Sequence, residues 1–224
     1  MVSTKVVYEG YGMTDKAENT KQNILAAAME HFLEYGFAGA SLRSIVKAAG
    51  LTTGAFYKYY PTKEALFDAL VDPYVEHLYG IYDGILEEFQ GLTAHEQTEN
   101  MARTSSDGIE QMVDYVYEHY DNFRLLLRCS DNEKYGEMIH GLVDREMHSS
   151  KRYVEDMRSA GIAVPDISDS LGHMIYSGFF SAIFQIIEHD MDKEVAIENV
   201  RQLKDFYTGG WERLWGVRFP EKEG

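Results

Sequence analysis

The segment from residue 41 to residue 67, SLRSIVKAAGLTTGAFYKYYPTKEALF, constrains the fold more than any other part of this chain. Apolar residues recur at helical spacing after Leu42, and Gly50 follows where a helix end favours a left-handed residue. Thr52 then caps a second, very short helix. Pro61 ends that helix, because the residue before a proline is disfavoured in the α conformation. Two short helices joined by such a turn, and followed by a third, form a helix-turn-helix.

Residues 20–70 as a whole resemble the DNA-binding domain of the tetracycline-repressor (TetR) family of bacterial transcription regulators. Tyr59 and Tyr60 stand where that family usually has His-Phe. Tyrosine keeps an aromatic ring and a hydrogen-bonding hydroxyl, so the substitution at these two positions is expected to alter a phosphate contact and to leave the fold unchanged. From residue 71 onward the resemblance is one of architecture only. The matching positions are Ile24, Leu25, Ala28, Phe32, Gly36, Phe37, Gly50, Gly54, Tyr57, Lys63, Glu64 and Leu66.

A helix-turn-helix places its second helix in the major groove of DNA. We predict that Thr53 and Ala55 face base edges, since a hydroxyl and methyl groups can read sequence there. Tyr57, Tyr59 and Lys63 are predicted phosphate ligands, which fix the register of the protein on the duplex. For each residue the alternative is a solvated side chain beside a structural turn. The predicted DNA-contacting residues are Ser41, Arg43, Thr52, Thr53, Ala55, Tyr57, Lys58, Tyr59 and Lys63.

The net charge of −16 is unusual for a protein that binds DNA, but it is unevenly distributed. Residues 1–66 hold seven Lys or Arg and six Asp or Glu, a net of +1, which leaves −17 for the rest of the chain. The acidic part is expected to repel DNA and so weaken non-specific binding. A solvated acidic surface explains most of this charge, and a cationic ligand is the alternative.

The predicted fold is all-α with about nine helices, because long segments show helical spacing and no segment alternates with period two. We expect a flexible arm over residues 1–14 and a three-helix, helix-turn-helix DNA-binding domain over 15–62. The resemblance implies a larger C-terminal helical domain over 63–224, which binds an effector and dimerises.

Caps and helix-breaking residues set the expected helix limits. The first helix is expected over about 15–35, ending at Gly36, and the third over about 53–59. Pro73 is expected to kink or break the fourth helix, which starts at Lys63. The polar stretch 91–106 is expected to be a loop or a short helix. Later helices are expected over about 107–119, 123–127, 134–159, 168–189 and 193–215.

The last two predicted helices carry more apolar surface than a single chain of this size can cover, since the first of the two is apolar almost all round. In the resembled family these helices pair with those of a second subunit as a four-helix bundle, so we expect a homodimer. The alternative is an internal hairpin within one chain. The predicted interface residues are Phe179, Ile183, Ile187, Leu203, Phe206 and Trp211.

The resemblance also implies a cavity in the helical body for an unidentified small-molecule effector, which we expect to be hydrophobic or cationic. Aromatic, methionine and isolated polar residues on buried faces are the candidates for its lining, and ordinary core packing is the alternative for each. These candidates are Tyr115, Phe123, Leu126, Met138, Met147, His173, Tyr176, Phe180 and Phe184.

No cofactor or metal site is predicted. His140, Asp144 and His148 share a helix face, but on a straight helix they span about 12 Å and cannot converge on one ion. The single cysteine, Cys129, suggests a reducing, cytoplasmic location. No run of eighteen apolar residues or signal-peptide core is present, so neither a membrane partner nor export is expected.

The sequence thus favours a one-component transcription regulator that binds a pseudo-palindromic DNA operator as a homodimer. Repression relieved by the effector is the preferred mode. A transcriptional activator or a protein–protein adaptor on the same fold is the alternative. An all-helical enzyme is least favoured, because no nucleophile–base pair or phosphate-binding loop is visible.

Overall fold

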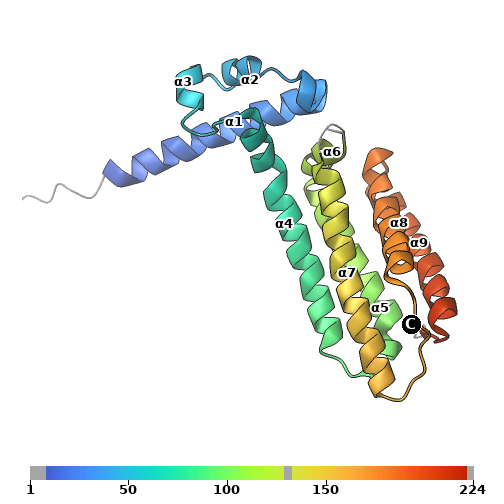
Figure 1. Ribbon diagram of the computed structural model, residues 1–224. Coiled ribbons are helices and arrows are strands. Elements are labelled where there is room, and N and C mark those ends of the chain that lie inside the picture. The colour runs from blue at the N-terminus through green and yellow to red at the C-terminus, as the bar shows by residue number, and fades with distance from the viewer. Residues whose placement is uncertain (1–8, 129–132, 221–224) are drawn as a thin grey trace, which may run out of the picture. The chain divides into compact units, whose positions relative to one another are not determined.

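The computed structural model describes residues 9–128 and 133–220 of the chain (Figure 1). These residues form nine α-helices and no β-strand, which confirms the all-α prediction. Residues 1–8 of the predicted arm and Cys129 lie outside the described residues, whereas residues 9–14 are helical. The helices are α1 (Glu9–Gly39), α2 (Leu42–Ala48), α3 (Thr53–Phe56), α4 (Lys63–Gln90), α5 (Ala94–Glu118), α6 (Tyr120–Arg128), α7 (Lys134–Ser159), α8 (Asp169–Glu188) and α9 (Lys193–Trp215).

The described residues divide into two compact units. The first unit takes the chain up to Pro73 together with the end of α6 from Arg124. The second unit takes Tyr74–Phe123 and the helices α7, α8 and α9. The division therefore falls inside α4, later than residue 62, where we expected the domain boundary.

The first unit is built around α1, α2 and α3, in which α2 contacts both of the others. On α1 the buried side chains of this core recur every four residues, at Ile24, Ala28 and Phe32. The Phe67 ring lies edge-on to the ring of Phe32, 5.5 Å away, and to that of Phe37, 5.1 Å away. The buried residues of this core are Ile24, Ala28, Phe32, Ile45, Val46, Phe56, Leu66 and Phe67.

Helix α1 is longer at both ends than predicted. It begins at Glu9 and continues past Gly36, which has φ +72° and interrupts the helical geometry. One further turn then forms, because the Ala40 amide donates to the Gly36 carbonyl at 3.1 Å. A glycine at this position lets the chain kink without ending the helix, since it lacks the Cβ that penalises a positive φ.

The turn between α2 and α3 is closed by backbone hydrogen bonds around Gly50, which has φ +70°. The Leu51 amide donates to Val46 at 3.0 Å, and the Gly50 amide donates to Lys47 at 3.1 Å. This pair of bonds is the Schellman motif, which satisfies the last carbonyls of a helix and needs a left-handed residue after it. Thr52 then caps α3 by accepting from the Ala55 amide at 3.2 Å.

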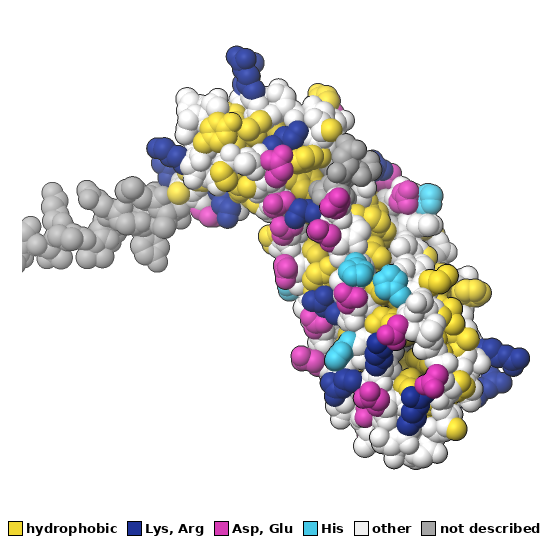
Figure 2. Space-filling model, viewed as in Figure 1, with side chains coloured by type: hydrophobic (Ala, Val, Ile, Leu, Met, Phe, Trp, Pro, Cys, Tyr) yellow, Lys and Arg dark blue, Asp and Glu magenta, His cyan; other side chains and the backbone are white. Residues whose placement is uncertain are grey.

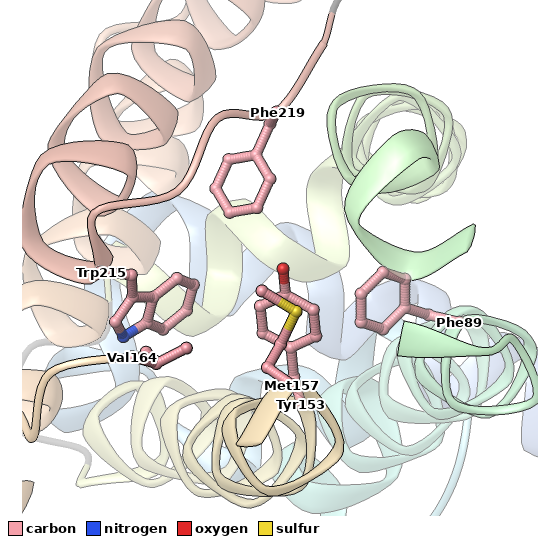
Figure 3. Close-up of a cluster of buried hydrophobic side chains, with 6 residues drawn as sticks. All are labelled: Phe89, Tyr153, Met157, Val164, Trp215 and Phe219. Atoms are coloured by element: carbon pink, nitrogen blue, oxygen red, sulfur yellow. The ribbon is translucent and has the colours of Figure 1, made fainter. Parts of the chain in front are cut away.

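The second unit is a bundle in which α7 packs on α8, α5 packs on α9 and α7, and α8 packs on α9. Figure 3 shows side chains from α4, α7, the loop that follows α7, the last residue of α9 and the segment after it, all turned toward one another. They are Phe89, Tyr153, Met157, Val164, Trp215 and Phe219, and all are buried.

The stretch 91–106, which we expected to be a loop or short helix, belongs mostly to α5. That prediction was wrong, because Thr93 and Glu96 form a capping box that starts the helix at Ala94. Packing against α4 then stabilises the first turns of α5, since Gln97 is fully buried and its side-chain amide donates to the Phe89 carbonyl at 3.2 Å.

Pro73 lies within α4, which runs without a break from Lys63 to Gln90. A proline has no amide hydrogen, so the carbonyl of Ala69, four residues earlier, loses its helical donor. Helix α4 is thus continuous across the division between the two units, but it lacks one hydrogen bond where they divide.

We expect Gly50→Ala to lower the free energy of unfolding by about 1–2 kcal/mol, the cost of a Cβ in the left-handed conformation. Gly54→Ala is the matched control, since Gly54 lies in α3 and its added Cβ would meet no atom within 4 Å. This control is expected to be neutral or stabilising. Urea denaturation measures both, and equal stability of the two variants would contradict the role assigned to Gly50.

Candidate functional site

The surface formed by α2, α3 and the turns that flank them exposes most of the predicted DNA-contacting residues. Tyr57 is half exposed, at 50%, and Ala55, Tyr59 and Lys63 are partly buried. Ile45 and Phe56 are buried beneath this surface, as expected for core residues. The exposed members are Ser41, Arg43, Thr52, Thr53 and Lys58.

Helix α3 is shorter than the predicted span 53–59, because it ends at Phe56. Turns then carry the chain to Pro61, closed by a 2.8 Å bond from the Tyr59 amide to the Phe56 carbonyl. Phe56 anchors α3 in the core, and Thr53 and Lys58 point away from it. A helix of four residues can present only a few side chains to a binding partner.

The segment from Ser41 to Lys63 carries local positive charge. It contains Arg43, Lys47, Lys58 and Lys63 and no Asp or Glu. Figure 2 shows Lys and Arg side chains standing out from the part of the surface that α1–α3 form. Such a surface attracts the phosphates of nucleic acid even though the whole chain is acidic.

Lys63 has an internal role that the sequence did not reveal. Its Nζ donates to the carbonyls of Ala40 at 3.1 Å and Ala38 at 3.4 Å, and it lies 4.7 Å from the centre of the Phe37 ring. The ammonium therefore satisfies carbonyls at the end of α1. These two bonds use two of the three N–H donors of the ammonium group, and phosphate binding by Lys63 stays a prediction.

The start of α4 is capped by Thr62, which accepts from the Ala65 amide at 3.0 Å. The pKa of Glu64 is lowered, first by a hydrogen bond from its own backbone amide and then by one from the Thr62 hydroxyl. The anionic form of Glu64 is thus favoured at the positive end of the helix dipole.

The second unit encloses a cavity of about 130 Å³ between α4, α5, α7, α8 and α9. Of the predicted pocket residues, Tyr176 and Phe180 line this cavity. Its aromatic lining is Tyr82, Phe89, Tyr153, Tyr176, Phe179, Phe180, Tyr207, Trp211, Trp215 and Phe219.

Glu146 is the one carboxylate in the lining of this cavity, and the sequence analysis missed it. It accepts hydrogen bonds from the hydroxyls of Tyr82 and Ser150, and Ser150 in turn bonds to Tyr176. Burial raises the pKa of Glu146, while the bonds from Tyr82 and Ser150 oppose that rise. Burial and the charge of Glu146 together hold the pKa values of Tyr82 and Tyr176 well above 10.

A second cavity of about 220 Å³ adjoins the first, and the two share Ser150, Tyr176, Trp211 and Trp215 in their linings. Met147, a predicted pocket residue, lines this second space. Its walls carry two ion pairs, Lys151–Asp169 at 2.8 Å and Arg158–Asp166 at 2.6 Å. The Tyr176 and Trp211 rings, stacked 4.8 Å apart, belong to both cavities.

The other predicted pocket residues line neither cavity. Phe123 and Phe184 stack on each other at 6.3 Å in the core, whereas the Tyr115 ring lies between those of His77 and His119. His173 is exposed and lies 5.6 Å from the ring of His140. Leu126 and Met138 are buried.

The predicted interface residues fall on different sides of α8 and α9. Ile183 and Ile187 are buried inside this chain, so their side chains are not available to a second one. Trp211 faces the two cavities, and Phe179 and Leu203 are partly buried. Phe206 is 75% exposed, and the other exposed large apolar residues of the two helices are Leu171, Met174, Val195 and Leu214.

Helix α8 meets the length and hydropathy of a membrane span, with a mean hydropathy of 1.3. In this fold it packs between α7 and α9 and buries Tyr176, Phe180 and Phe184. Figure 2 shows hydrophobic side chains that reach the surface where α8 lies in Figure 1. The helix thus has a buried inner side and an exposed apolar outer side.

His140 and Asp144 form a pair at 3.4 Å, and both are largely exposed. His148 is exposed on the same helix. Within the described ranges, no group of three or more His, Cys, Asp or Glu is arranged to hold a metal ion.

Comparison with known proteins finds a match for residues 24–70, which lie within the first unit. A family described as "Bacterial regulatory proteins, tetR family" matches residues 24–70, which confirms the resemblance seen in the sequence. The relatives are transcriptional regulators and not enzymes. One is the uncharacterized HTH-type transcriptional regulator YdgC of Bacillus subtilis, which is 29% identical over 109 residues, 49% of this chain and 53% of YdgC.

A second relative is the HTH-type transcriptional repressor AcnR of Corynebacterium glutamicum, 32% identical over 80 residues, 35% of this chain and 43% of AcnR. The chain thus spans about half the length, or less, of these relatives. Among solved structures, the TetR family regulator PfmR of Thermus thermophilus has a TM-score of 0.56 at 18% identity, covering 82% of this chain and 95% of PfmR. At that identity the likeness concerns the fold alone.

Tyr60 provides a test of the first unit, because its buried hydroxyl has no hydrogen-bond partner among the described residues. We expect Tyr60→Phe to raise the free energy of unfolding by about 1 kcal/mol, since an unsatisfied buried donor is removed. Tyr82→Phe is the control, because it removes a hydroxyl that donates to Glu146. It is expected to destabilise, and urea denaturation in which Tyr60→Phe destabilised equally would refute the argument.

Glu146 provides a test of the cavity. Its folded-state pKa lies above that of the unfolded chain, so its contribution to stability is present at low pH and is lost as the pH rises through the folded pKa. Glu146→Gln cannot ionise, so we expect the stability of the variant relative to that of the parent to increase as the pH rises above the ordinary carboxyl pKa of about 4.3 and through the raised folded-state pKa. Glu137→Gln, an exposed position on the same helix, is the control. A pH-independent difference for Glu146→Gln contradicts the assignment.

Proposed function

We propose, with the TetR-family domain at residues 24–70 as the premise, that this protein is a DNA-binding transcription regulator that responds to a ligand. The observation that carries the proposal is the exposed surface of α3. The turn at Gly50 fixes this helix, Phe56 anchors it, and it presents Thr53 to solvent. The cations around it favour a polyanion.

The proposed roles on DNA follow from side-chain chemistry. Thr53 and Ala55 read base edges in the major groove, where threonine offers a hydroxyl and both offer a methyl group. Tyr57, Tyr59 and Lys58 contact phosphates, which position the helix without reading sequence. Arg43, exposed on α2, reaches either a base or a phosphate.

A homodimer is proposed because the outer side of α8 and α9 is apolar and exposed in the single chain. Phe206 and Met174 are 75% and 70% exposed, and large apolar side chains exposed to this degree are candidates for an interaction surface. A second copy covers this surface in a two-fold pair. Its two helix-turn-helix units then read half-sites about 34–36 Å apart, as a pseudo-palindromic operator requires.

Helix α4 supports coupling between an effector and DNA binding. Its first residues follow the cap at Thr62, and its later residues Tyr82, Ile85, Leu86 and Phe89 line the cavity. One continuous helix therefore belongs to both functional regions. An effector that prefers one position of α4 by about 1–3 kcal/mol changes DNA affinity about 5- to 150-fold.

Repression, relieved when the effector binds, is the preferred mode, since the relative AcnR is a repressor by name. Activation on the same fold is the alternative, and transcription assays with and without the DNA site separate the two. Location in the cytoplasm, where the DNA is, follows from the same proposal.

We expect the purified protein to bind a duplex from upstream of its own gene in preference to a scrambled duplex, measured by fluorescence anisotropy at moderate salt. Thr53→Ala is expected to reduce this preference by about 1–3 kcal/mol and leave the scrambled duplex unaffected. Lys58→Ala is expected to weaken binding to both duplexes and to lower the salt dependence.

The control for loss of a cation is Arg103→Ala, at an exposed position of α5 in the second unit. It is expected to leave both affinities and the salt dependence unchanged. Equal binding of the two duplexes by the parent protein refutes the proposed function, and so does a preference that survives Thr53→Ala and Arg43→Ala together.

A further inference from the structure

The cavity of the second unit contains two charged side chains, Glu146 and Lys204, which are in different electrostatic situations. Lys204 is buried, but its Nζ lies 2.6 Å from the Asp205 carboxylate and 2.9 Å from the Ser106 hydroxyl. Its charge is therefore already balanced within the protein.

Glu146 has only neutral donors. It accepts from Tyr82 and Ser150, and no Lys or Arg of the described ranges forms an ion pair with it. Its neighbour Arg145 is engaged elsewhere, since its Nε lies 2.8 Å from the carboxylate of Asp83. Glu146 is partly shielded from solvent, and a carboxylate shielded from water without a counter-ion costs free energy, part of which a cation placed beside it recovers.

The walls around Glu146 suit a cation as well. Tyr176 and Trp211 stack 4.8 Å apart, and Tyr82 lies edge-on to Phe180 at 5.6 Å. The faces of aromatic rings attract an ammonium group within about 6 Å and also pack against an apolar body. The cavity thus offers one negative group within an aromatic enclosure.

We propose that this cavity takes a small organic amine, protonated on nitrogen, whose ammonium group pairs with Glu146 and whose apolar body lies among Tyr176, Trp211 and Phe180. This inference rests on the proposed function, because it identifies the chemical class of the effector. A protonated Glu146 must give up its proton when the ammonium group pairs with it, because the pair requires the carboxylate form.

The volume limits the size of this amine. A cavity of about 130 Å³ is close to the roughly 150 Å³ that holds one benzene molecule in an engineered core. Drug-sized ligands occupy about 300–1,000 Å³. A ligand confined to this first cavity is therefore a single ring, or an aliphatic body of similar size, with its amine on a short arm, and a longer body would extend past Tyr176 and Trp211 into the adjoining cavity.

The test uses the full-length protein without DNA and three sets of ring-sized probes. The amines are benzylamine and phenethylamine, the neutral isosteres are benzyl alcohol and phenethyl alcohol, and the anions are benzoate and phenylacetate. Isothermal titration calorimetry at pH 7, in two buffers of different ionisation enthalpy, gives affinity and proton release together. We expect the amines to bind at least about tenfold more tightly than their neutral isosteres, and the anions to bind least.

Glu146→Gln keeps the size of the side chain and removes its charge. It is expected to reduce amine affinity at least about tenfold, as for loss of a partly buried charge partner, and to leave the alcohols unaffected. Glu137→Gln, exposed on the same helix, is expected to bind like the parent. Thermal unfolding checks that each variant is folded.

The inference is overturned if the amines bind no better than the alcohols, if the anions bind best, or if Glu146→Gln retains amine affinity. Anisotropy on the upstream duplex separates this result from the proposed function. DNA binding without amine binding refutes only the ligand class. Amine binding without DNA binding refutes the proposed function and leaves the ligand class standing.

Discussion

Only a residue that tolerates a positive φ can follow Ala49, and Gly50 supplies it at φ +70°. The two bonds that close this turn, from Gly50 to Lys47 and from Leu51 to Val46, set the direction of the chain into α3. Phe56 then seats α3 in the core, and the opposite side of the same short helix is left to solvent. The contacts with DNA that are proposed for Thr53 and Ala55 on α3 depend on this one backbone conformation.

Local features of the first unit could be predicted from the sequence because their causes lie within a few residues. The caps at Ser41, Thr52 and Thr62 each act three residues ahead, and the structure contains all three. Pro73 is a position where the local sequence was a poor guide. We expected a kink or a break there, but α4 continues through Pro73, so the low helix propensity of proline did not end the helix.

The cavity could not be predicted in the same way. Glu146 is one of 37 acidic residues, and it meets Tyr82 and Tyr176 only after distant helices pack. One signal was available, since Glu146 lies on the side of α7 that also carries Leu142, Ser149 and Tyr153, all buried. Similarly, the apolar character of α8 was evident, but packing decided that Ile183 faces inward and Met174 outward.

Lys63 is the first residue of α4, yet its ammonium group binds carbonyls at the end of α1, and Phe67 one turn later packs on Phe32. The opening turns of α4 therefore complete the fold of the N-terminal unit. A chimera that grafts this unit onto a foreign helical body should carry the native sequence at least as far as Pro73, and its helical body should retain the end of α6 from Arg124, which belongs to the same compact unit. A junction placed at residue 62 would leave the transplanted unit without its last structural supports.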